Sequence, residues 1–169
     1  MLKKLGLCGA LALVLVAAFG TLAPTRSAGQ ATANGSDAKR LEFRSHAVQE
    51  EFVDVGKKGL SVGDYSVLYG EVSQKGEKVG TDGGTCMLVY ITYDGKDVKD
   101  YTLQCIVTVK LREGQLTHQG LLTLAAKGAP KPYTLAVTGG TGNYKGARGE
   151  AKVTPVSQTD ADVVVTLID

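Results

Sequence analysis

The chain has 169 residues, with 19 Lys or Arg against 17 Asp or Glu. Three of the basic residues (Lys3, Lys4 and Arg26) lie in an N-terminal segment that resembles a secretory signal, and without them 16 basic and 17 acidic residues remain. A mature chain so close to neutrality lacks the basic surface that binds DNA or RNA, so nucleic acid is excluded as a partner. About 135 residues are enough for one domain with a sizeable core.

The N-terminus has the three parts of a secretory signal peptide. A basic start, MLKK, is followed by an apolar run over residues 5–20 and by Ala31-Thr32-Ala33, which has the small-residue form of a cleavage site. We predict a signal peptide over residues 1–33. A cut at Ala23 or Ala28, and a retained membrane anchor, are the alternatives. The mature protein is then secreted, to the extracellular space or the cell envelope, with no membrane contact after signal removal.

After a polar leader (34–40), the sequence alternates short strands with Gly-rich turns in one domain, 41–169. No segment of this domain keeps apolar residues at helical spacing for more than two turns. The predicted strands cover residues 41–55, 64–73, 85–93, 99–111, 115–126, 133–138, 147–156 and 161–168. This pattern is typical of an all-β barrel or sandwich.

Several of these strands are apolar on both faces. In CMLVYITY the first face carries Cys86, Leu88 and Tyr90, and the other carries Met87, Val89, Ile91 and Tyr93. A sandwich with a wet outer face would alternate apolar and polar residues. The pattern therefore favours a barrel with an apolar interior and a second buried surface outside it, such as a subunit contact. A barrel of about eight strands either encloses one small ligand or fills with side chains.

Two cysteines remain after signal removal, and an exported protein with an even number favours a disulfide. The segment YDGKDV between them is typical of a hairpin turn. A turn centred on Gly95-Lys96 predicts three cross-strand pairs: Tyr90 with Tyr101, Leu88 with Leu103, and Cys86 with Cys105. Directly opposed cysteines are within bridging range. A slip to a turn at Asp94-Gly95 would instead place Cys86 opposite Leu103.

Two stretches resemble catalytic motifs but lack the required context. GGTGNYKG has neither P-loop nor dinucleotide-binding spacing, and GLSVG around Ser61 precedes a strand instead of the helix of a nucleophile elbow. His46 and His118 have no metal-ligand spacing, so no metal is expected. We interpret both histidines as surface or rim residues. Cys86 as a nucleophile is the alternative to its disulfide.

The order of several short motifs resembles the plant allene oxide cyclases across roughly 100 residues. The motifs are GD (63–64), VG (79–80), GTC (84–86), GQLTHQG (114–120) and LAVTGGTGNYKGARGEAKV (135–153). The last motif is equally similar to the dirigent proteins, and its turn and fold positions are Gly139, Gly140, Gly142, Tyr144 and Gly149. The resemblance implies an eight-stranded antiparallel, calycin-like barrel, often a homotrimer, with a hydrophobic interior.

In those families the interior holds a reactive molecule for stereoselective cyclisation or coupling, and neither reaction needs a cofactor. The resemblance places Cys86 at a pocket cysteine and Glu42 at an acidic residue of the first strand. A pocket Asn of the cyclases falls at Gly70, so that polar anchor is missing. The candidate ligand-lining residues are Glu42, Leu68, Cys86, Leu88, Tyr90, Tyr101 and Leu103.

Two functions follow from these observations. The first is a secreted barrel that binds a small hydrophobic molecule and directs its stereoselective cyclisation or coupling without a cofactor. The second is a non-catalytic extracellular or envelope scaffold, because the sequence shows no proper acid–base pair. The catalytic residues of the first function are not identified by the sequence.

Overall fold

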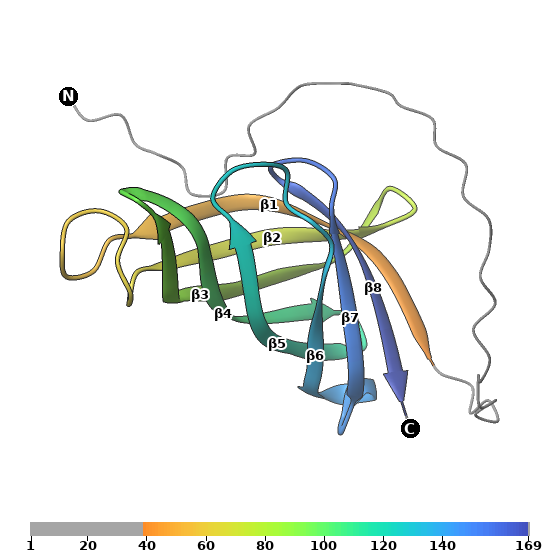
Figure 1. Ribbon diagram of the computed structural model, residues 1–169. Coiled ribbons are helices and arrows are strands. Elements are labelled where there is room, and N and C mark those ends of the chain that lie inside the picture. Colours follow the sequence, from red (N-terminus) through yellow and green to blue (C-terminus); the bar gives the residue numbers. More distant parts are fainter. Residues whose placement is uncertain (1–38, 169) are drawn as a thin grey trace, which may run out of the picture.

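A computed structural model describes residues 39–168 as a closed barrel of eight antiparallel strands (Figure 1), which confirms the predicted fold class. The predicted signal peptide and most of the leader lie outside the described residues. The strands are β1 (Arg40–Val53), β2 (Tyr65–Gln74), β3 (Glu77–Asp94), β4 (Asp97–Leu111), β5 (Gly114–Ala125), β6 (Tyr133–Gly140), β7 (Arg148–Pro155) and β8 (Asp160–Ile168). Within this part of the chain, no helix is long and apolar enough to span a membrane.

Each strand pairs with the next in sequence, and β8 returns to pair with β1. The closing register runs from Arg40 opposite Thr166 to His46 opposite Asp160, and Figure 1 shows these two strands side by side. The loops that follow β1, β3, β5 and β7 lie at one end of the barrel, which we call the open end. The turns that follow β2, β4 and β6 lie at the other, the closed end.

The closed end is filled by the larger of the two apolar clusters. A short 3-10 helix, η1 (Gly142–Tyr144), places Tyr144 in this cluster with 5% of its surface exposed. Gly140 must be glycine here, because a Cβ at that position would lie 2.4 Å from the carbonyl oxygen of Tyr144. Gly142 takes the left-handed conformation at φ 61°. The GGTGNY stretch is therefore a turn that closes the barrel.

Strand β3 begins eight residues earlier than predicted. The segment 74–84 reads as a long Gly-rich turn, but only Lys75 and Gly76 form the turn, and the ladder starts at Glu77. Its glycines have a packing role: a Cβ on Gly84 would lie 2.3 Å from the carbonyl oxygen of Ile106 on β4. Glycine in a strand can thus mark a place where two backbones approach closely. The sequence pattern alone does not distinguish such a glycine from one in a turn.

The β3–β4 hairpin keeps the predicted register at the cysteines but not throughout. Leu88 pairs with Leu103 and Cys86 with Cys105, whereas Tyr101 pairs with Ile91 instead of the predicted Tyr90. Two irregularities cause the difference. One extra residue on β4 near the turn shifts the register, and one extra residue on β3, between Leu88 and Tyr90, restores it. Such bulges turn the side chains between them to the opposite face.

Candidate functional site in the barrel interior

Solvent reaches the barrel interior beyond the closed-end cluster. Val107 faces inward between Val109 and Cys105, which are 2% and 1% exposed, yet Val107 itself is only partly buried. Four of its inward neighbours are also partly exposed (Leu68, Gly84, Cys86 and Gly120), whereas His118, directly opposite on β5, is buried. Because strand alternation points these positions into the barrel, their exposure indicates a hollow at this level.

Asp82 on β3 occupies the next inward position beyond Gly84, towards the closed end. It pairs with Gly70 on β2 and Val109 on β4 and is 6% exposed. A Cβ on Gly70 would lie 2.4 Å from its Oδ1, so the carboxyl group lies directly over that glycine. Ser45 Oγ donates a 2.5 Å hydrogen bond to Oδ2. Burial raises the pKa of Asp82, and the Ser45 hydrogen bond opposes that rise.

His118 on β5 projects inward from the other side of β4, opposite Val107. It is 2% exposed, which contradicts its interpretation as a surface or rim residue. Burial lowers its pKa from 6.5 to about 4, so the imidazole is neutral near pH 7. By contrast, His46 does lie at the surface, where its Nδ1 is 3.0 Å from Asp160 Oδ1.

Asp82 Oδ1 and His118 Nε2 are buried and have no hydrogen-bond partner. Such atoms are rare in folded proteins, because leaving a buried polar group unsatisfied costs about 1–3 kcal/mol. Both belong to the same part of the interior, since their β4 partners, Val109 and Val107, share the inner face two residues apart. A carboxylate accepts hydrogen bonds, and a neutral imidazole can both donate and accept. The interior therefore contains two polar groups whose hydrogen-bonding capacity is unsatisfied.

The predicted ligand-lining residues divide between the two faces. Leu68, Cys86, Leu88, Tyr101 and Leu103 occupy inward positions. Glu42 and Tyr90 do not.

Glu42 alternates with the buried Phe43, and its exposed carboxylate lies 2.6 Å from Arg40 Nε. Tyr90 is 60% exposed because the irregularity between Leu88 and Tyr90 turns it outward. The one acidic candidate, Glu42, thus lies on the outer face. The buried polar residues Asp82 and His118 were not among the predicted lining residues.

Cys86 and Cys105 form a disulfide with a 2.01 Å bond between their sulfur atoms. Cys105 packs in the smaller apolar cluster with Leu122 and Leu135, and Cys86 contacts the same cluster. A bonded sulfur is neither a thiolate nucleophile nor a thiol donor. Cys86 therefore contributes an apolar part of the wall.

The β1–β2 loop is anchored at the open end by Asp64, which is fully buried. Its carboxylate accepts hydrogen bonds from the backbone N–H of Val55 (2.8 Å) and of Ser61 (2.6 Å), and from Ser61 Oγ (3.2 Å). Burial opposes ionisation, yet these hydrogen bonds bring the pKa of Asp64 below its usual value. Leu88 N–H donates to the Asp64 carbonyl at 2.7 Å. Ser61 holds this loop as a turn residue.

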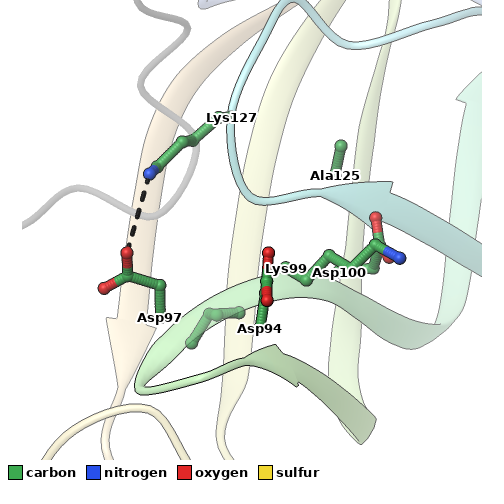
Figure 2. A pocket seen from close by; sticks show the side chains of 7 residues that line it. Asp94, Asp97, Lys99, Asp100, Ala125 and Lys127 are labelled. Carbon is green, nitrogen blue, oxygen red and sulfur yellow. Dashed lines mark ion pairs between the residues drawn. The ribbon is translucent and has the colours of Figure 1, made fainter.

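A second recess, of about 350 Å³, lies beside the β3–β4 hairpin (Figure 2). Its lining consists of Asp94, Asp97, Val98, Lys99, Asp100, Ala125 and Lys127. Lys127 Nζ and Asp97 Oδ2 are 3.9 Å apart, and both side chains are mostly in water. Charges so exposed are screened and flexible, so this ion pair does not hold a fixed geometry that would recognise a ligand. In residues 39–168, no three His, Cys, Asp or Glu side chains converge as a metal site requires.

A family model agrees with this architecture. The model of the allene oxide cyclase barrel-like domain matches residues 41–167. The chain belongs to this family. Comparison with the sequences of curated proteins gave no match.

Solved structures with the same fold include several enzymes. A pyocyanin demethylase is 29% identical, with a TM-score of 0.66 over 77% of this chain and 100% of the other. The exo-specific intermolecular Diels-Alderase AbnU is 14% identical, with a TM-score of 0.58 over 78% and 98% of the two chains. The pterocarpan synthase dirigent protein GePTS1 is 15% identical, with a TM-score of 0.52 over 85% and 94%. This family member thus shares its barrel fold with a Diels-Alderase and a dirigent protein.

Sequence reasoning missed Ser45, Asp82 and His118 for different reasons. The inward position of His118 could have been predicted from strand alternation. It lies two residues from Leu116, a core position, and two from Gly120, so it shares their inner face. Asp82 was hidden because its segment reads as a turn. Ser45 acquires its importance only through Asp82, 37 residues away.

Proposed function

We propose that the barrel binds a small hydrophobic molecule in its interior and directs the stereoselective cyclisation or coupling of that molecule. The observation that carries this proposal is the pair of unpartnered buried atoms, Asp82 Oδ1 and His118 Nε2, in a mostly apolar interior. A bound molecule would supply the missing hydrogen bonds. A solid structural core would have no reason to retain them.

The chemistry would be catalysis by positioning. A reactive molecule held in one conformation loses its competing conformations before it reacts, and well-oriented intramolecular reactions gain up to about 7–11 kcal/mol in this way. The apolar wall from Leu68, Leu103 and the disulfide would exclude water from reactive intermediates. Asp82 and His118 would fix the orientation of the molecule through its polar group. The names of the similar structures, a demethylase, a Diels-Alderase and a dirigent protein, support a small-molecule reaction in this fold.

Adjacent residues on β4 allow a matched test. Val107 faces the hollow, and Thr108 beside it faces outward, opposite Gly83 and Thr117. We expect native mass spectrometry of the protein purified from its own host to show a co-purifying compound. Val107→Phe should lose that compound, because its ring fills the hollow, whereas Thr108→Phe should keep it. Titration with pyocyanin, the compound in the name of a similar structure, extends the test to a defined probe.

Two results would contradict the proposal. One is the repeated absence of any bound compound together with no binding of the probe. The other is equal retention of the compound by Val107→Phe and Thr108→Phe, which would place it outside the interior. Either result would favour the scaffold function.

We also propose that the protein is secreted. The predicted signal peptide motivates this, and the Cys86–Cys105 disulfide is compatible with an oxidising destination. Detection of the mature chain outside the cytoplasm, with its N-terminus near residue 34, is the expected result. Recovery of the full-length chain from the cytoplasm would contradict it.

A further inference from the structure

The polar pair in the interior has a definite chemical preference. Asp82 Oδ2 is occupied by the Ser45 hydroxyl, whereas Oδ1 is buried and free to accept a hydrogen bond. When Asp82 is ionised, its carboxylate can only accept, so the group that then meets Oδ1 must be a donor. The neighbouring His118 Nε2 is also unpartnered and is neutral, so it can satisfy either a donor or an acceptor on the same molecule.

The interior offers no positive charge to an anion. The buried polar or charged residues among 39–168 are Asp64, Asp82 and His118, and no Lys or Arg is among them. Asp64 is saturated by Val55 and Ser61. A ligand carboxylate placed in the hollow would therefore meet the carboxylate of Asp82 without a compensating cation. Burying an unpaired charge is costly, and a second like charge adds to that cost.

Both groups lie within reach of one small molecule. Asp82 lies on β3 and His118 on β5, the two strands that flank β4. Two strands with one strand between them are about 10 Å apart. The side chains point inward and shorten that span.

We infer that the interior site selects a neutral or cationic molecule that donates a hydrogen bond to Asp82 and contacts His118, and that it rejects carboxylates. This inference rests on the proposed binding of a small molecule in the interior.

Three probes of one ring size test the inference: 2-naphthol, 2-methylnaphthalene and 2-naphthoate. The first donates a hydrogen bond, the second is apolar, and the third is an anion. The chain contains no Trp, so binding can be followed by the fluorescence of the probes at about pH 8. We expect 2-naphthol to bind about tenfold more tightly than 2-methylnaphthalene, as hydrogen bonds to charged groups allow. We expect 2-naphthoate to bind more weakly than either.

Variants assign the preference to its residues. Asp82→Asn removes the charge at nearly constant shape, so it should abolish most of the preference for 2-naphthol and admit 2-naphthoate. His118→Leu should weaken 2-naphthol and leave 2-methylnaphthalene unchanged. The matched control is His46→Leu, at the exposed histidine, which should leave all three affinities unchanged. Thermal melting of each variant verifies that it is folded.

The outcomes separate this inference from the proposed function. Equal binding of 2-naphthol and 2-methylnaphthalene by the wild-type protein would overturn the inference and leave hydrophobic binding intact. A preference that survives in both Asp82→Asn and His118→Leu would also overturn it. If none of the three probes binds, both the inference and the interior binding site are contradicted. The wild-type ranking alone decides the inference if a variant does not fold.

Discussion

Asp82 and His118 place two polar atoms in the interior without giving them a partner, and each such atom lowers the stability of the fold. Gly70 is part of the same arrangement, because any larger side chain there would displace the Asp82 carboxylate. The strand residues around them follow the expected apolar alternation. Local departures from otherwise consistent design tend to occur at functional positions, where stability is given up for activity. At the scale of single residues, this departure supports the proposed site.

Replacement of His118 by Leu should therefore stabilise the protein. The folded-state pKa of His118 is lowered from 6.5 to about 4, so protonation favours the unfolded chain. The wild-type stability is fully present above pH 6.5 and falls as the pH drops towards 4, by on the order of 3 kcal/mol. Urea unfolding across this range should show the loss in the wild type and in His46→Leu, and His118→Leu should lack it. The same pH slope in His118→Leu would show that the imidazole is not buried.

The strands differ in how closely their bounds could be predicted from the sequence. The strands at 41–55, 133–138 and 161–168 were predicted close to their observed bounds, because apolar alternation and turn residues agree there. The segment 77–84 was missed because glycine occurs both in turns and where two strand backbones approach closely. Only the position of the neighbouring strand shows that the second role applies here. The reversal of Tyr90 depends on an irregularity that leaves no signal in the pattern. The cysteine register was predictable because the two irregularities of this hairpin cancel.

The β3–β4 hairpin gives a prediction at the scale of the element. The cysteines are 19 residues apart, and closing a loop of about this length stabilises the folded state by about 3 kcal/mol in the chain-entropy model. The variant with both Cys86→Ala and Cys105→Ala should therefore lower the free energy of unfolding by roughly that amount. Intact mass should rise by two hydrogen atoms when the wild-type protein is reduced. An unchanged mass would show that the bond does not form in solution.

The whole barrel has no free strand edge, since β8 pairs with β1, so its outer surface meets other molecules through side chains. That surface is apolar on one side. Met87, Ile106 and Leu121 come from β3, β4 and β5, and they are 45%, 46% and 64% exposed. Cross-strand pairing links them, because Met87 and Leu121 both face Gln104 and Ile106 lies two residues along β4. An exposed apolar patch that spans neighbouring strands is typical of a protein contact.

We propose that this patch joins subunits of a homotrimer, the assembly that the family resemblance suggests. Burial of a Leu or Met side chain contributes about 1.5–3 kcal/mol, so a charge at two such positions should outweigh the association energy of a modest interface. Light scattering coupled to size exclusion should give the mass of a trimer for the wild-type protein and of a monomer for the variant with Met87→Glu and Leu121→Glu. The matched control, Glu42→Gln on β1, should remain trimeric. A monomeric wild-type protein would contradict the trimer and leave the apolar patch for a different partner.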